Sequence, residues 1–189
     1  MKISSPLLIV ILAVAGVLTG CQSPKATTLV GSSVAQATRN NCYSLLHQLL
    51  NDQKNVSLLR FIKREQDDVK NLVKKIAARS ATGAKLLEEF ARHDPAIRLD
   101  DLQLPLGEVA TREAIAATKK KELLGQTGNE FELSLLLTQT EALDYACHLA
   151  KVAGANEAQP DRARALAALS ADMANLYHEV FVLLLAKTK

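Results

Sequence analysis

Histidine and carboxylate side chains are the residues of this chain that could bind a metal. A ferritin-like bundle binds iron through Glu-x-x-His motifs, which place both ligands on one helix face. The histidines are His47, His93, His148 and His178, and the residues three positions before them are Ser44, Phe90, Tyr145 and Asn175, none of which is a carboxylate. The nearest substitute is Asp144 with His148, with Glu141 one turn earlier. We expect a solvated helix face there, and a metal site is the alternative.

Motifs for covalent and phosphoryl chemistry are missing from the sequence. It contains no Gly-x-Ser-x-Gly elbow, no Cys-x-x-Cys-His haem motif and no glycine-rich phosphate loop. Cys147 directly precedes His148, and adjacent residues on a helix do not face each other, so the two do not form a catalytic pair. A glycosidase needs two carboxylates beside a cleft, and no pair stands out. We therefore expect a protein that is not an enzyme and has no cofactor.

A group of charged residues in the second half of the chain has the spacing of a structural ion pair. Glu108 and Arg112 are one helical turn apart, and Glu132 and Gln139 are a heptad apart among leucines. If the two helix faces meet, Arg112 and Glu132 form a buried ion pair that fixes the helix register. We expect this role to be structural.

Composition excludes several classes of protein. The 189 residues are 48% hydrophobic, 23% charged and 4% aromatic, which is typical of a globular chain and not of a disordered or collagen-like one. Lys and Arg number 23 against 20 Asp and Glu. This near balance gives no argument for binding nucleic acid.

The first residues have the pattern of a secretory signal. After Lys2, an apolar run extends from Pro6 to Gly20 and ends in Leu18-Thr19-Gly20-Cys21. The run is short for a membrane span, which needs roughly 20 apolar residues. Its last four residues resemble the lipobox of bacterial lipoproteins, and the resemblance covers residues 1–21 only.

This resemblance implies where the chain is located. Residues 1–20 are then a signal peptide, and Cys21 carries a diacylglycerol thioether and becomes the acylated first residue. Several acyl chains on one residue give stable membrane anchoring. Gln22 stands where an Asp commonly marks inner-membrane retention in that family, so the outer membrane is favoured, with the protein facing the periplasm.

Helical periodicity dominates the rest of the chain. Residues 21–40 are rich in Ser, Thr, Ala and Gln and predict a flexible tether with a reach on the order of 25 Å. Residues 41–189 predict one domain. Five helices are expected in it. The first starts after Asn40-Asn41, and the second covers residues 57–92 with a kink or break expected at Gly83 as one alternative. The third covers residues 105–124, the fourth covers residues 129–153 and begins with an Asn129–Glu132 capping box, and the fifth starts at Pro160. The fold class is all-α, an antiparallel bundle of four to five helices.

Two cysteines are left once Cys21 carries lipid. Cys42 and Cys147 both lie on apolar helix faces in an oxidising compartment, and an antiparallel pairing would bring them to the same end of the bundle. We predict a disulfide between them, and two buried free thiols are the alternative.

Basic residues concentrate in the second predicted helix. Lys63, Arg64, Lys70, Lys74 and Lys75 form a face that could contact anionic headgroups or an acidic partner, whereas a solvated face is the simpler interpretation. The function expected from these patterns is a lipoprotein adaptor, pilot or assembly factor that binds an envelope protein. A ligand- or metal-carrying ferritin-like bundle is the alternative.

Overall fold

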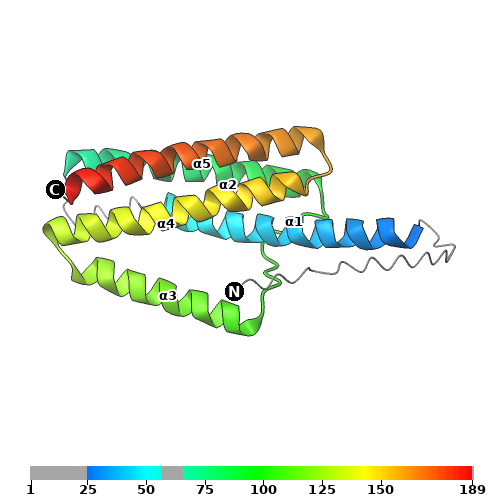
Figure 1. Cartoon of the computed structure of the whole chain (residues 1–189), viewed down its shortest axis with the longest axis horizontal. Coiled ribbons are helices and arrows are strands. Elements are labelled where there is room, and N and C mark those ends of the chain that lie inside the picture. The colour runs from blue at the N-terminus through cyan, green and yellow to red at the C-terminus, as the bar shows by residue number, and fades with distance from the viewer. Residues whose placement is uncertain (1–24, 57–65, 189) are drawn as a thin grey trace, which may run out of the picture.

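The structure, a computed structural model, describes residues 25–56 and 66–188, with side chains from residue 33 onward. The described residues form helices and short connections and contain no strand, which confirms the all-α class (Figure 1). The helices are α1 (Lys25–Lys54), α2 (Asp67–His93), α3 (Leu106–Gly125), α4 (Gly128–Ala155) and α5 (Pro160–Lys187). Residues 1–24, which include the predicted signal and Cys21, lie outside the described residues.

The start of α1 differs from the sequence prediction. We expected a flexible tether up to Asn40, but the chain is helical from Lys25 onward, so that prediction is wrong for residues 25–40. The end of the expected tether is also part of the packed domain. Arg39 is buried, and Asn40 donates a hydrogen bond of 2.9 Å to the carbonyl of Ala96.

Four of the helices form the bundle, and α3 lies outside it (Figure 1). Around the bundle, α1 packs against α2 and α4, and α5 packs against α4 and, over a smaller interface, α2. Neighbouring helices run antiparallel. For example, Asp68 near the start of α2 contacts Lys187 at the end of α5, and Asp94 just after α2 contacts Arg162 at the start of α5.

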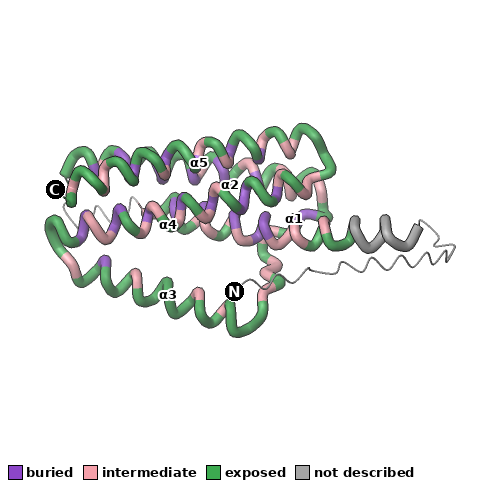
Figure 2. Tube along the Cα trace, in the orientation of Figure 1, coloured by how far each residue is buried: buried purple, intermediate pink, exposed green. Residues whose placement is uncertain are grey.

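The core lies between these four helices. Figure 2 shows buried positions along their inward faces, whereas α3 is largely exposed. The largest fully buried side chains include Tyr43 and Leu46 from α1, Ile76 from α2, Phe131 from α4 and Met173 from α5. The buried stripe of α5 runs from Leu166 to Val180, and Leu183, one turn further on, is partly buried against the core.

Helix α2 continues through Gly83 without a break. A Cβ atom at this position would lie 2.9 Å from Leu169 Cδ1 and 3.0 Å from Leu50 Cδ1. The glycine therefore lets α1 and α5 approach α2 closely, and it does not act as a hinge. The predicted start of this helix at Ser57 falls outside the described residues, and the described helix begins at Asp67.

The start of α4 also corrects a prediction. Asn129 and Glu132 were expected to form a capping box, but α4 begins at Gly128 after the N-cap residue Thr127, which makes no side-chain cap hydrogen bond. Gly128 has φ of 57°, a conformation that glycine adopts without strain, and it turns the chain from α3 into α4. Glu132 is consequently free to point into the bundle.

Candidate functional site

A buried cluster of charges closes the end of the bundle where α4 turns into α5. The carboxylate of Glu157 accepts hydrogen bonds from Tyr43 Oη at 2.9 Å and from Arg162 Nη2 at 2.9 Å. Arg39 Nη1 lies 3.6 Å from the same carboxylate, and Arg162 Nη1 also contacts Asp94 at 2.8 Å. The cluster therefore ties together α1, the residue that follows α2, the α4–α5 turn and α5.

The titration behaviour of this cluster follows from its burial and its hydrogen bonds. The side chain of Glu157 is 0% exposed. Burial opposes its charged form, but hydrogen bonds from Arg162, the Gln159 backbone and Tyr43 outweigh that effect, so the pKa of Glu157 lies below its ordinary value. Burial and the hydrogen bond to Glu157 raise the pKa of Tyr43. At neutral pH the carboxylate is charged and the phenol is neutral.

A second buried charge lies at the opposite end of the bundle. Glu132, which is 3% exposed, accepts hydrogen bonds from Lys187 Nζ at 2.9 Å and from the backbone N–H of Gln66 at 2.5 Å. Lys187 also contacts Asp68 at 3.1 Å. Although burial opposes the charged form of Lys187, hydrogen bonds to Glu132 and Asp68 raise its pKa. The contact set stabilises the charged form of Lys187.

The prediction that Arg112 pairs with Glu132 is therefore wrong. Glu132 does form a buried ion pair, but with Lys187 of α5. Arg112 lies on α3 and bonds Glu108 at 2.7 Å, as their spacing of one turn predicts. Its other bond is to Tyr145 Oη at 2.7 Å, and its guanidinium lies 5.1 Å from the centre of the Tyr145 ring.

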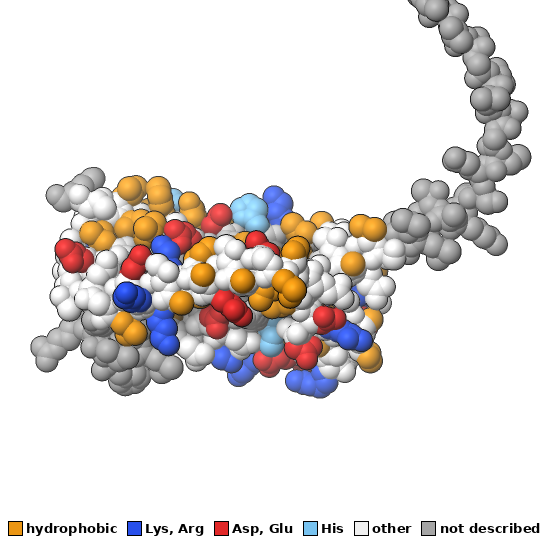
Figure 3. Space-filling view, turned by 90° about the horizontal axis from the view of Figure 1, so that it is seen from below, with side chains coloured by type: hydrophobic (Ala, Val, Ile, Leu, Met, Phe, Trp, Pro, Cys, Tyr) orange, Lys and Arg blue, Asp and Glu red, His pale blue; other side chains and the backbone are white. Residues whose placement is uncertain are grey.

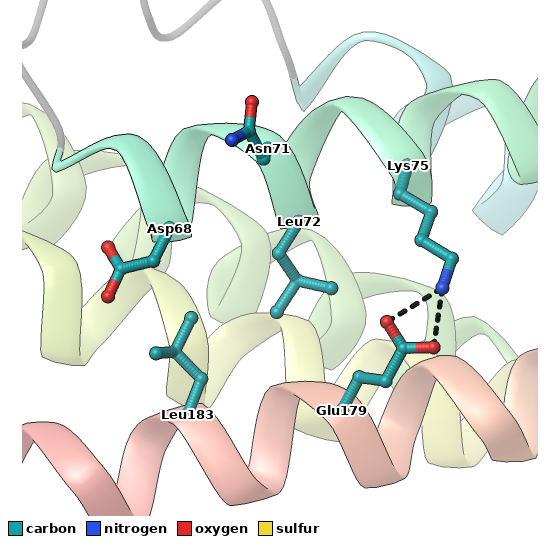
Figure 4. A pocket seen from close by; sticks show the side chains of 6 residues that line it. All are labelled: Asp68, Asn71, Leu72, Lys75, Glu179 and Leu183. Atoms are coloured by element: carbon teal, nitrogen blue, oxygen red, sulfur yellow. Dashed lines mark hydrogen bonds and ion pairs between the residues drawn. The ribbon is translucent and has the colours of Figure 1, made fainter.

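A shallow groove of about 310 Å³ lies between α2 and α5 (Figure 4). Leu72 and Leu183 point toward each other across it, and Lys75 Nζ contacts both oxygens of Glu179 at 2.6 and 2.8 Å at one side. Arg79 and Asp172 form a further bridge of 3.6 Å between these helices. Two ion pairs thus bridge α2 and α5 on the surface, beside the leucines that line the groove.

These bridges change the interpretation of the basic face. Lys75 is paired with Glu179, and Lys70 lies 3.7 Å from Asp67 in its own helix. Lys74 is exposed. Lys63 and Arg64 lie outside the described residues. Within the described part of α2, much of the predicted positive charge is therefore balanced by neighbouring carboxylates.

Neither a disulfide nor a cluster of metal ligands is formed by the described cysteines, histidines and carboxylates. Cys42 and Cys147 are both free, so the predicted disulfide is not formed in the structure, and Cys147 Sγ lies 3.4 Å from Ser170 Oγ. Asp144 and His148 lie 3.5 Å apart on an exposed face of α4. Among the described residues, no group of three His, Cys, Asp or Glu side chains is placed to hold a metal.

Of the five described helices, α3 contributes the fewest buried residues to the core. Of its residues only Leu123 is buried, while Leu106 is 89% exposed and Ile115 is 55% exposed. Polar contacts also join it to α4, through Arg112 and through Lys119, which lies 3.6 Å from Glu141. Seen from the side of α3, hydrophobic side chains lie scattered between charged ones over the molecule (Figure 3).

Helix α5 is long and apolar enough to cross a membrane by length and composition alone, a test that the core helix of a soluble bundle also passes. In the structure 22% of its most apolar stretch is buried. Much of this apolar character therefore lies on the outer face of the helix.

Comparison of the chain with protein-family models, with curated proteins and with solved structures finds no match in any of the three.

Proposed function

We propose that this chain is a cell-envelope lipoprotein that acts as a non-enzymatic adaptor or assembly factor and binds an envelope protein through α3. The proposal combines the lipobox-like sequence at Cys21 with one structural observation. Helix α3 lies outside the four-helix core and exposes Leu106 and Ile115 to solvent. The outer membrane is the favoured location because Gln22 follows the acylated cysteine.

The way α3 is attached supports a binding role. One buried leucine and a few polar contacts hold it to α4, so its side chains contribute little to the core. Exposed apolar side chains that the fold does not need are available to a partner. A protein surface with apolar patches and some acidic groups would fit, because the exposed Lys120 and Lys121 follow Ile115 on the same helix.

The experiment that tests the proposal is quantitative co-purification of the lipidated chain from envelope extracts after brief crosslinking. A Cys21→Ser version tests the anchor, and a Leu106→Glu, Ile115→Glu version tests α3. Val34→Glu is the matched control, because Val34 is an exposed apolar residue on α1, which packs against α2 and α4.

A stoichiometric protein partner that is lost in the α3 variant and kept in the Val34 control supports the proposal. Because Leu106 and Ile115 are exposed, the α3 variant should unfold at the same temperature as the wild type. Capture that is identical in the α3 variant and the wild type would refute the role of α3. Stoichiometric metal or a small molecule without a protein partner would instead favour the alternative, a carrier bundle.

A further inference from the structure

The outward face of α5 carries a second regular pattern besides the stripe that enters the core. Six exposed positions follow alternating spacings of three and four residues: Ala168, Ala171, Asn175, His178, Val182 and Leu185. None of them is charged. Val182 is 51% exposed and Leu185 is 49% exposed, so about half of each large residue is open to water.

This spacing is the one that packs helices together in coiled coils. Within the described chain, α4 and α2 cover the other sides of α5, and no described helix covers this face. The residues are small at the beginning of the face and large at its end. The occupant must therefore offer large side chains beside the alanines and small ones beside Val182 and Leu185.

We propose that the occupant is α5 of a second copy of this chain, packed antiparallel about a two-fold axis. That arrangement places Ala168 opposite Leu185 of the second copy and Ala171 opposite Val182 of the second copy. Each large side chain then meets a small one in every apolar layer. A parallel pair would instead set alanine against alanine and leucine against leucine, which leaves one end loosely packed.

The two polar positions of the face support the same register. The axis falls between Asn175 and His178, so the antiparallel pair brings each asparagine opposite a histidine of the second copy. The amide and the imidazole can each donate and accept a hydrogen bond. The pair then contains two such polar layers, and polar residues at core positions are a recognised way to fix register in a coiled coil.

The residues that flank the face are compatible with this pairing. On one side, the partly exposed ring of Phe181 covers Ala174 of the second copy. On the other side, Asp172 and Glu179 approach each other across the axis. Each is already paired with a cation of α2, Arg79 and Lys75, so the like charges are compensated.

Disulfide crosslinking of the full chain in its own membrane tests the proposal. In the antiparallel pair, residue 171 lies beside residue 182 of the second copy, but about 16 Å along the axis from its own counterpart, at 1.5 Å per residue. A disulfide needs Cα atoms roughly 4.4–6.8 Å apart. Chains with both Ala171→Cys and Val182→Cys should therefore form a covalent dimer, and chains with either change alone should not.

Two controls make the result specific. The unsubstituted chain gives the background from the native cysteines, and Val152→Cys on α4 reports random collisions at another exposed apolar position. Adding Leu185→Asp to the double-cysteine chain should reduce the dimer band at least tenfold, and this chain should still unfold in one cooperative transition. If the doubly substituted chain stays monomeric although both thiols react with a maleimide, the proposal is overturned. Dimers from each single variant would indicate a parallel pair and would overturn it equally.

Discussion

Replacing Glu157 by glutamine should destabilise the fold more than any exposed charge change. The substitution keeps the size of the side chain but turns one carboxylate oxygen into an amide NH₂ group, which cannot accept a hydrogen bond. Arg162 keeps its 2.8 Å contact with Asp94. Arg39, whose side chain is 9% exposed, has no other carboxylate within 4.0 Å among the described residues and is left as a buried, unpaired cation.

The size of the effect follows from these contacts. A hydrogen bond to a charged group contributes about 1.5–3 kcal/mol, and breaking one member of a buried ion pair costs about 3–5 kcal/mol. Because Arg162 keeps one partner, we expect a loss near the lower end of the second range, about 3 kcal/mol at pH 7. For a domain of this size, that corresponds to a fall in melting temperature of about 6–12 °C.

Urea unfolding followed by circular dichroism measures this difference, and its pH dependence tests the cause. The pKa of Glu157 is lower in the folded chain than its ordinary value of about 4.3, so its contribution is complete above that pH and disappears as the pH falls through the folded pKa. The gap between wild type and Glu157→Gln should therefore be constant from about pH 7 to pH 5 and shrink below about pH 4.

The matched control is Asp161→Asn, which removes the exposed carboxylate that pairs with Arg164 in the same turn of α5. It should change stability by less than about 0.5 kcal/mol, as exposed pairs do. Equal losses for Glu157→Gln and Asp161→Asn, or a gap that persists unchanged at pH 3, would refute the argument from the buried cluster.

Three further perturbations test other features of the fold. Lys187→Met leaves the buried carboxylate of Glu132 without its cation and should lower urea stability by about 2–4 kcal/mol; an unchanged midpoint would mean that the pair contributes nothing net. Gly83→Val forces the side chains of Leu169 and Leu50 away from α2 and should lower the free energy of unfolding by about 1–3 kcal/mol in the same assay. A stabilised variant would contradict the close approach of the helices. Arg112→Ala removes a polar anchor of α3, so amide exchange measured by mass spectrometry should accelerate in α3 and stay unchanged in α5.

The later helices could be predicted from the sequence because strong local signals mark their ends. Pro105 precedes α3, Gly125 ends it, and Pro160 begins α5. The start of α1 could not be predicted in this way. Its first half has no stripe of large apolar residues, and its Ser and Thr residues are weaker helix formers than Ala or Leu.

The buried ion pairs were harder to predict because sequence spacing does not say which helices are neighbours. Glu132 was expected to be a buried acid, but its partner Lys187 lies 55 residues further along the chain, and nothing in the sequence around Lys187 marks it as a buried cation. The Glu157 cluster was missed because its carboxylates follow the ends of helices, where exposure is the usual expectation. One signal was available: Arg39 stands one turn before Tyr43, on the apolar face of the first helix.

The path of α3 along the outside of the bundle has a consequence for folding. Helices α2 and α4 run in the same direction, so the chain must travel back along the bundle between them, and α3 is that return. The α4–α5 hairpin brings together residues such as Cys147 and Ser170, 23 apart, whereas the contact of Tyr43 with Glu157 spans 114 residues. Closing the longer loop costs about 1.4 kcal/mol more in chain entropy. During synthesis from the N-terminus, the face of α1 that packs on α4 therefore stays uncovered until most of the chain has been made. The α4–α5 hairpin is synthesised last, but its short loop lets it form quickly once both helices are present.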